Sequence, residues 1–232
     1  MNIAWDADNY ADNFSFVPAY GKSVLELVTP GKGLAVDLGC GTGALSPGLE
    51  DKGYEVIGID DSEAMLEKAR ETYPGLAFIK GNALDFSLER KADVIFSNAV
   101  FHWIDAAKQE ALAENLSHNL RRGGELAAES GGKGCAEAVH SALEKAFQER
   151  GLVYPRVFYF PSISDLRHAL RPSYRLEARA RCQGLGADVR HQALRGDGGR
   201  DPDRGGGSAQ EPPAASEWFI DYVRIRVKAV RL

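Results

Sequence analysis

The strongest chemical signal in the chain is a glycine-rich turn that directly follows an apolar run. Residues 36–43 read Val-Asp-Leu-Gly-Cys-Gly-Thr-Gly. Gly39, Gly41 and Gly43 carry no Cβ atom, so backbone N–H groups and the start of a following helix can approach a ligand closely. The next apolar run ends on Asp60, where a carboxylate can accept both hydroxyls of a ribose. This pair of features indicates a site for a cofactor that contains adenosine.

Several segments in a fixed order carry a resemblance to a known family. They are 37–43, 58–62, 81–83, 97–103 and 120–124. In this order they resemble the glycine motif, acidic loop, adenine loop, fourth-strand end and fifth-strand turn of the class I S-adenosylmethionine-dependent methyltransferases. Within that family the chain looks most similar to the small-molecule branch that includes trans-aconitate and malonyl carrier protein O-methyltransferases. The resemblance covers about residues 5–170 and resumes near residue 218.

The resemblance implies that S-adenosylmethionine is the cofactor and assigns residues to it. Asp37 would reach the methionine amino group, directly or through water, and Asp60 would bind the ribose. Asp61 would flank the junction of adenine and ribose, although it can equally serve as a helix N-cap. The expected cofactor contacts are Asp37, Gly39, Cys40, Gly41, Gly43, Asp60, Asp61, Asn82, Ala83 and Asn98.

Two of these positions depend on amide groups. Asn82 stands where many relatives have an aspartate, and its amide oxygen can still accept a hydrogen bond from the adenine amino group. Ala83 would donate its backbone N–H to the ring. Asn98 ends the fourth expected strand, beside the point where open α/β sheets bind ligands, and would face the sulfonium.

Methyl transfer from a sulfonium is an in-line displacement with a neutral leaving group, so the protein mainly positions the acceptor and excludes water. His102 is the candidate general base for a hydroxyl or amine acceptor, whereas a carboxylate acceptor needs no base. The alternative is a histidine that only packs beside the pocket. Candidate acceptor contacts are Trp5, Tyr20, Trp103 and Lys133. Lys133 belongs to a Gly-Gly-Lys-Gly cluster that reads as a tight turn rather than a phosphate loop.

Apolar runs alternate with helical patterns from Leu34 onward, which is typical of a doubly wound parallel sheet. The expected strands are 34–38, 54–59, 76–79, 94–97 and 124–128, and the expected helices include 44–52, 106–120 and 135–150. Two further strands with period-2 alternation begin near Tyr174 and Val223. We therefore predict an α/β fold with a Rossmann-like seven-stranded, mostly parallel sheet that ends in an antiparallel hairpin.

The expected organisation has three parts. Residues 1–30 are aromatic-rich and would form a helical lid over the cofactor, or else a helix packed on the sheet edge. Residues 31–170 would be the cofactor-binding core, and residues 171–232 the terminal hairpin. Within the hairpin, residues 183–217 are rich in glycine, arginine and proline and cannot bury much apolar surface. They are either a natural insertion or the product of a shifted reading frame.

Composition narrows the function classes. The chain has 232 residues, of which 44% are apolar and 26% charged, as in one soluble α/β domain. It shows no secretory signal and no membrane-length apolar run, so we expect a cytoplasmic protein without a membrane partner. A net charge of −5 disfavours a nucleic-acid substrate. The cysteines, Cys40, Cys135 and Cys182, have no paired spacing, which argues against disulfides and a metal site. Oligomeric state stays open.

Three other functions compete with a small-molecule methyltransferase. A nicotinamide-dependent oxidoreductase shares the glycine spacing up to Ala44, but Asp37 and the third glycine argue against it. A base-modifying methyltransferase would have prolines where this chain has 98–101. A vestigial cofactor-binding protein would keep the glycine turn and lack a complete acceptor pocket.

Overall fold

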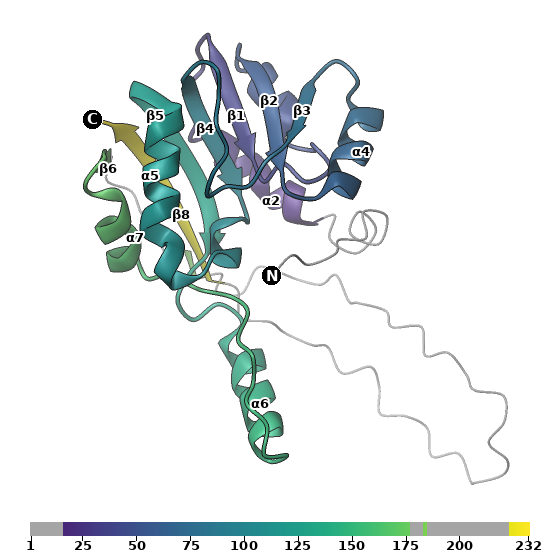
Figure 1. The fold of residues 1–232 in the computed structure, drawn as a ribbon, viewed down its shortest axis with the longest axis vertical. Coiled ribbons are helices and arrows are strands. Elements are labelled where there is room, and N and C mark those ends of the chain that lie inside the picture. The colour runs from purple at the N-terminus through teal and green to yellow at the C-terminus, as the bar shows by residue number, and fades with distance from the viewer. Residues whose placement is uncertain (1–15, 177–182, 185–222) are drawn as a thin grey trace, which may run out of the picture.

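The computed structural model describes residues 16–176, 183–184 and 223–232 (Figure 1). The expectations for Trp5 and for the composition-biased segment, apart from its first two residues, lie outside these ranges. The side chain of Tyr20, in the first described helix, lies outside the description as well. None of the described helices is both long enough and apolar enough to cross a membrane.

One mixed sheet forms the centre of the molecule, with the strand order β3-β2-β1-β4-β5-β8-β6 and β7 also paired to β8. The strands are β1 Leu34–Leu38, β2 Glu55–Asp60, β3 Ala77–Lys80, β4 Ala92–Asn98, β5 Leu120–Gly131, β6 Tyr174–Leu176, β7 Gln183–Gly184 and β8 Val223–Arg231. β1 to β5 pair in parallel, and β8 is antiparallel to β5, β6 and β7. Because β5 occupies one edge of β8, β6 and β7 share the other. The predicted seven-stranded, mostly parallel sheet with an antiparallel end is confirmed, and the short strand β7 is an addition to it.

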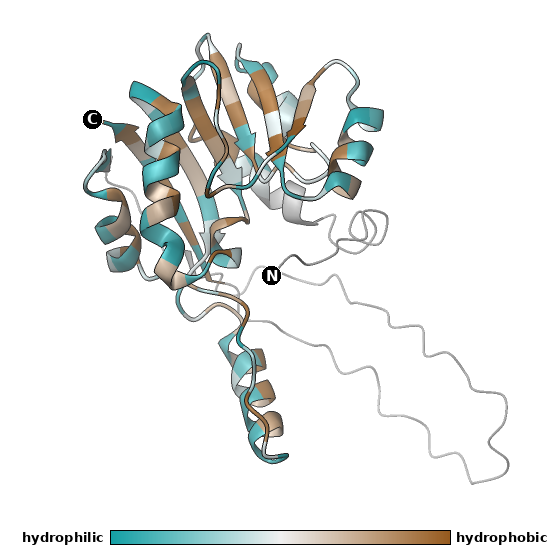
Figure 2. Ribbon diagram, in the orientation of Figure 1, coloured by the Kyte–Doolittle hydropathy of each residue, from teal (hydrophilic) through white to brown (hydrophobic). Residues whose placement is uncertain are grey.

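Helices cover both faces of this sheet (Figure 1). The helices are α2 Phe16–Leu25, α3 Ser46–Glu50, α4 Glu63–Thr72, α5 Gln109–Asn119, α6 Glu137–Gln148 and α7 Ile163–Leu170, and the 3-10 turns are η1 Phe101–Trp103 and η2 Ala106–Lys108. Alternate residues of β1 explain the two layers. Leu34 and Leu38 join one core cluster with α5 and α7, whereas Ala35 joins a second cluster with α2 and α3. Apolar strands lie inside, and the outer faces of α4 and α5 are polar (Figure 2).

The helices are shorter than the sequence pattern predicted. The helix expected over 44–52 spans Ser46–Glu50, and the helix expected over 106–120 divides into η2 and α5. Ser62 caps α4 by accepting the N–H of Met65, so the alternative capping role of Asp61 is not used. The helix α7 was not anticipated from the sequence, although its start carries a capping box between Ser162 and Asp165.

The helix α6 points away from the body of the molecule, and the chain that follows it returns alongside (Figure 1). Its one buried residue is His140, whose Nδ1 lies 2.9 Å from the Tyr154 hydroxyl of the returning segment. The backbone N–H of Tyr159 then donates to the carbonyl of His102 at 3.0 Å. This contact holds the returning segment against η1, beside the carboxyl end of the sheet.

Candidate cofactor and acceptor site

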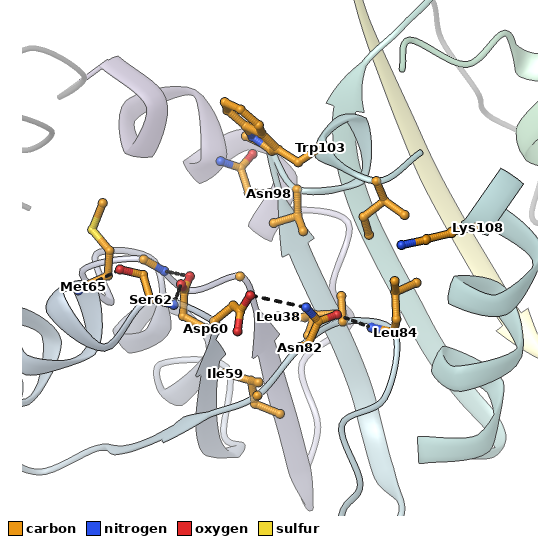
Figure 3. A pocket seen from close by; sticks show the side chains of 18 of the residues that line it. Leu38, Ile59, Asp60, Ser62, Met65, Asn82, Leu84, Asn98, Trp103 and Lys108 are labelled. Atoms are coloured by element: carbon orange, nitrogen blue, oxygen red, sulfur yellow. Dashed lines mark hydrogen bonds between the residues drawn. The ribbon is translucent and has the colours of Figure 1, made fainter. Parts of the chain in front are cut away.

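A cavity of about 890 Å³ lies at the carboxyl ends of β1, β2, β3 and β4. This is where the strand order reverses between β1 and β4, and crevices at such points bind ligands in open α/β sheets. Asp60, Asn82, Asn98 and Lys108 surround the cavity from different sides, and Lys108 directs its amine toward it (Figure 3). Four separate loops thus converge on one space.

The three glycines of the turn after β1 have different physical roles. A Cβ atom on Gly39, at φ 71°, would lie 2.1 Å from a methyl group of Val100. A Cβ atom on Gly43 would lie 2.7 Å from the ring of Phe78. Gly41, at φ 54°, has nothing within 4 Å of its hypothetical Cβ and lines the cavity. Gly39 and Gly43 therefore allow close packing, whereas Gly41 leaves room for a ligand at the cavity wall.

Asp60 connects this turn to the next loop. Its Oδ2 accepts the Gly41 N–H at 2.8 Å, and its Oδ1 accepts the Ser62 N–H at 2.9 Å. Burial raises the pKa of Asp60, and the two N–H donors oppose that rise. A carboxylate has about four lone-pair sites, so two remain in principle for hydroxyl donors in the cavity.

Asp37 and Cys40 do not reach the cavity with their side chains. Asp37 is buried and accepts a hydrogen bond from the Ser46 hydroxyl at 2.7 Å. Burial raises the pKa of Asp37 to about 7. Burial also raises the pKa of the Cys40 thiol, so it stays protonated. The Asp37 side chain therefore does not line the cavity, and its expected contact with the cofactor stays a prediction.

The expected adenine loop lies across from the glycine turn. Asn82 donates from Nδ2 to Asp61 Oδ2 at 3.3 Å, and its Oδ1 accepts the Leu84 N–H at 3.0 Å. Both Asn82 and Asp61 line the cavity, as does Ala83, whose carbonyl accepts from the Asn115 amide at 3.1 Å. Asn82 Oδ1 keeps a second lone pair, so its predicted role toward an adenine amino group remains chemically available.

The end of β4 turns sharply at Ala99. Ala99 has φ 61°, and its N–H donates to the Glu129 carbonyl at 2.8 Å. This left-handed conformation is uncommon for a residue with a Cβ and concentrates at functional sites. The turn leaves Asn98 at the cavity wall. Gly21 of α2 lies beside Asn98, and a side chain at Gly21 would have no room there.

His102 is buried beside the cavity rather than in it. Its Nδ1 accepts the Gly131 N–H at 3.3 Å and lies 3.4 Å from the Ser130 hydroxyl. Burial lowers the pKa of His102 to about 4, so the ring is neutral near pH 7. With Nδ1 accepting, we assign the proton to Nε2. Trp103 does line the cavity, and its ring meets Phe158 edge-on at 4.4 Å between centroids.

The acceptor expectation for Lys133 gains no geometric support. Lys133 does not line the 890 Å³ cavity, and its backbone N–H donates to the Pro161 carbonyl. It lies in a tight turn before α6, as the sequence predicted. Within the described part of the chain, no group of three acidic, histidine or cysteine residues could hold a metal ion.

The structure adds cavity residues that sequence reasoning missed. They include Lys108 at the end of η2 and the segment 155–157 after α6. Arg156 in that segment is also paired with Glu137 at 2.7 Å. The sequence carried no distinct signal for this segment, because it reaches the cavity only through the path of the chain around α6.

Comparison with known proteins agrees with this geometry. The family model "Methyltransferase domain" matches residues 35–124, from β1 to the start of β5. Within these residues the chain is similar to the class I S-adenosylmethionine-dependent methyltransferases. The glycine turn, which follows β1, and Asp60, which ends β2, both lie within the matched residues.

Two curated methyltransferases and one solved structure illustrate the likeness. An uncharacterized methyltransferase of Schizosaccharomyces pombe is 35% identical over 145 residues, which cover 60% of this chain and 56% of that protein. The trans-aconitate 2-methyltransferase of Rhizobium etli is 32% identical over 163 residues, covering 65% and 62%. The magnesium protoporphyrin IX methyltransferase of Synechocystis PCC 6803, solved with bound SAH, has a TM-score of 0.57 at 18% identity, covering 96% and 84%.

The sequence matches cover only part of each curated relative. The alignments span 56% and 62% of the lengths of the two curated relatives. The structural neighbour, at 18% identity, supports the fold of a class I methyltransferase. The acceptor and the reaction of this protein therefore have to be argued from the chemistry of the site.

The site fits the cofactor of this methyltransferase family in its donor set. Gly41 leaves open space at the cavity wall, and Asp60 places a carboxylate on the same wall. Leu38, Ile59 and Leu84 add apolar surface for a ring. A nucleoside with ribose hydroxyls and a planar base matches these polar and apolar groups.

Proposed function

We propose that the protein transfers the methyl group of S-adenosylmethionine to an oxygen of a small molecule, and that this oxygen belongs to a carboxylate. The observation that carries the proposal is the 890 Å³ cavity, which joins the glycine turn and Asp60 to a second wall formed by Trp103 and Lys108. One wall suits the cofactor. The other combines apolar side chains with Asp105 and with the cations Lys108 and Arg156, and these cations suit an anionic organic acceptor.

Bound S-adenosylmethionine supplies an electrophilic methyl group on a sulfonium. The protein's own residues bind and orient. The backbone at Gly41 faces the cofactor, Asp60 accepts the ribose hydroxyls, and Asn82 accepts from the adenine amino group. Asn98, at the end of β4, lies between the cofactor wall and the acceptor wall.

The protonation state of His102 supports an acceptor that needs no base. A neutral ring with Nδ1 engaged by the Gly131 N–H has a hydrogen-bond donor, Nε2–H, and no free lone pair. A hydroxyl acceptor would have to lose a proton to a base, whereas a carboxylate is already ionised near pH 7. We therefore assign His102 a hydrogen-bonding role in place of proton abstraction.

The named relative points the same way. The Rhizobium etli protein is named for methylation of trans-aconitate, a small polycarboxylate. Its likeness to this chain, 32% over 62% of its length, makes carboxylates the first acceptors to try.

The test is isothermal titration with S-adenosylhomocysteine, followed by a turnover assay with a panel of mono-, di- and tricarboxylates. We expect saturable binding by the wild type and a large loss in Asp60→Asn, which keeps the side-chain shape and removes the charge. Asp51→Ala, at the far end of the sheet, is the matched control and should bind normally. No binding by folded wild-type protein would overturn the proposal.

Binding without turnover on any carboxylate, hydroxyl or amine acceptor would favour the alternative of a non-catalytic cofactor-binding protein. Turnover only on hydroxyls would keep the methyltransferase and reject the carboxylate. The two readouts therefore separate the cofactor part of the proposal from the acceptor part.

A further inference from the structure

The segment 98–105 forms one continuous wall of the large cavity, between the end of β4 and the start of η2. Its cavity-lining residues are Asn98, Ala99, Val100, Trp103, Ile104 and Asp105. Apart from Asn98, which ends β4, the regular structure of this segment is the three-residue turn η1. Such a loop keeps one conformation only when its backbone groups find partners outside it. The contacts that hold the segment therefore decide the shape of this wall.

The first part of the segment is tied to the cofactor side. The Ala99 N–H donates to the Glu129 carbonyl at 2.8 Å, which fixes the left-handed turn to β5. Val100 packs against Gly39, because a Cβ atom on that glycine would lie 2.1 Å from a Val100 methyl group. Residues 98–100 therefore follow the positions of β5 and of the glycine turn.

The second part of the segment, around Trp103, has different partners. Gln109, the first residue of α5, donates from Nε2 to the Phe101 carbonyl at 3.2 Å and to the Ile104 carbonyl at 2.8 Å. One amide group thus fixes the backbone on both sides of Trp103. Gln109 itself does not line the cavity.

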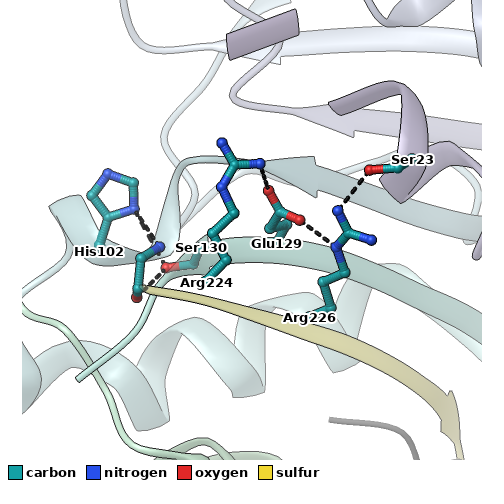
Figure 4. A network of polar contacts seen from close by, with 7 residues as sticks. Ser23, His102, Glu129, Ser130, Arg224 and Arg226 are labelled. Atoms are coloured by element: carbon teal, nitrogen blue, oxygen red, sulfur yellow. Dashed lines mark hydrogen bonds and ion pairs between the residues drawn. The ribbon is translucent and has the colours of Figure 1, made fainter. Parts of the chain in front are cut away.

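His102 provides an independent anchor for η1. Its Nδ1 accepts the Gly131 N–H at 3.3 Å and lies 3.4 Å from the Ser130 hydroxyl (Figure 4). Its carbonyl accepts the Tyr159 N–H at 3.0 Å. The position of His102 is therefore set by β5 and by the segment that returns from α6, whereas the neighbouring carbonyls depend on Gln109.

The hydrogen bonds of Gln109 are unusual for its place at the start of α5. Side chains at a helix start normally accept from the unpaired N–H groups of the first turn. The Gln109 amide instead donates to carbonyls of the preceding turn, and this residue is only 8% exposed. Other buried residues of α5 include Leu112, Ala113 and Leu116, so an apolar side chain would suit the packing of this face. The amide therefore serves η1 rather than its own helix.

We propose that Gln109 is a positioning residue for Trp103, which it holds at the acceptor side of the cavity through the carbonyls of Phe101 and Ile104. The proposal rests on the proposed methyltransferase function, in which Trp103 belongs to the acceptor wall. Because residues 98–100 have anchors of their own, loss of the Gln109 amide should disturb the acceptor wall and leave the cofactor wall in place.

The first measurement uses Trp103 as the reporter. In a background with Trp5→Phe and Trp218→Phe, Trp103 is the one tryptophan of the chain. Gln109→Met keeps the length of the side chain and removes both hydrogen bonds. We expect acrylamide to quench Trp103 about twofold more efficiently in Gln109→Met, because a less constrained loop opens more often. Gln148→Met, at the exposed end of α6, is the matched control and should be quenched as the background is.

A second variant tests the hydrogen bonds by protonation. In Gln109→Glu an ionised carboxylate would face two carbonyl oxygens, whereas the protonated form can donate one hydrogen bond. Burial raises the pKa of such a carboxyl group, so the protonated form gains as the pH falls from 8 to 5. We expect strong quenching of Trp103 at pH 8 and a return toward the background value at pH 5. The background is measured at the same pH values, and a packing defect alone would not follow protonation.

Binding and turnover, measured in the chain with all its tryptophans, separate the two sides of the cavity. The affinity of Gln109→Met for S-adenosylhomocysteine should stay within about twofold of wild type, because the anchors of residues 98–100 remain. The KM of the acceptor identified in the turnover assay should rise about 3- to 10-fold with kcat nearly unchanged, since a misplaced wall weakens ground-state and transition-state binding alike. Thermal unfolding checks that each variant is folded.

Each outcome has a distinct meaning. Equal quenching of Trp103 in the background and in a folded Gln109→Met variant would overturn the proposal. Equal losses of S-adenosylhomocysteine affinity and acceptor affinity would also overturn it, because Gln109 would then hold the whole segment. If Gln109→Met does not fold, Gln109→Glu decides, and quenching that does not change with pH contradicts the proposal. Wild-type protein that does not bind S-adenosylhomocysteine would reject the proposed function, and quenching would still decide whether Gln109 positions Trp103.

Discussion

The Asp60 carboxylate accepts the backbone N–H of Gly41 at 2.8 Å, although the two residues belong to loops after different strands. This hydrogen bond joins the two loops of the cofactor wall without a bound ligand. Gly39 and Cys40 reinforce it, because their N–H groups donate to the Ile59 carbonyl at 2.7 and 3.1 Å. A preformed wall lowers the ordering cost of binding.

Alanine at Gly39 and at Gly41 should have different effects. Gly39→Ala adds a Cβ that would lie 2.1 Å from Val100, so we expect a fall in unfolding free energy of more than about 2 kcal/mol. Gly41→Ala meets no neighbour within 4 Å, so only its left-handed φ opposes it, at about 1–2 kcal/mol. Gly41→Ala should therefore fold yet bind S-adenosylhomocysteine poorly. Denaturant unfolding and titration measure both, and equal losses of stability would contradict the assignment.

His102 and Asp37 should contribute opposite pH dependences to the free energy of unfolding, so that the two contributions largely cancel in the wild type. The unfolded chain binds a proton on His102 near pH 6.5, whereas the folded chain does so only near pH 4, so this group lowers stability as the pH falls through that window. The folded chain keeps the proton of Asp37 up to about pH 7, whereas the unfolded chain releases it near pH 3.8. Asp37 therefore lowers stability as the pH rises through an overlapping window.

Variants at either residue should reveal the other slope. In Asp37→Asn, which keeps an acceptor for the Ser46 hydroxyl, the unfolding free energy should rise from pH 4.5 to 6.5 by about 1.4 kcal/mol per pH unit relative to wild type. In His102→Gln it should fall over the same range by a similar amount. Urea unfolding at several pH values checks this. Parallel curves for both variants and wild type would show that neither group is shifted.

The dependence of activity on pH should also be informative. Because His102 is neutral well below pH 7, turnover of a carboxylate acceptor should show no ionisation near pH 6.5 in kcat. A bell-shaped profile with a limb near pH 6.5 that disappears in His102→Gln would restore the general-base role. The measurement is kcat against pH at saturating acceptor.

Trp103 should act on the acceptor rather than the cofactor. Its ring lines the cavity and rests edge-on against Phe158, so it forms a wall on the side away from Asp60. Trp103→Leu should raise the KM of the acceptor several-fold and leave S-adenosylhomocysteine affinity nearly unchanged. Phe147→Leu, which affects the outer contact with Tyr154, is the control. A loss of S-adenosylhomocysteine affinity in Trp103→Leu would contradict the assignment of Trp103 to the acceptor side of the cavity.

Ser62→Ala should cost about 1 kcal/mol of stability, because it removes the side-chain acceptor of the Met65 N–H at the start of α4. Asp61→Ala should cost less, since Asp61 does not cap the helix. Thermal unfolding of the two variants compares them directly. A larger loss in Asp61→Ala would show that its contact with Asn82 matters more than the cap.

Local sequence patterns were enough to predict the main strands of the sheet and the residues of the cofactor wall. Continuous apolar runs predict strands buried on both faces, and the run Val36 to Gly43 places its glycines directly after such a strand. Asp60 was predictable for the same reason, since it ends the next run. These features depend on neighbours in sequence, and neighbours in sequence remain neighbours in any fold.

Tertiary structure alone decided the features that depend on register and burial. Period-2 alternation set Arg224 and Arg226 apart from the apolar positions of β8, but only the pairing with Glu129 and the cover of α2 bury them. The neutral state of His102 follows from its burial, and the Gly131 N–H of β5 occupies its Nδ1. The hydrogen bond between Asp37 and Ser46 inside the protein was likewise not readable from the sequence. Long-range packing sets these contacts, because it fixes which strands and helices meet and how much water is excluded between them.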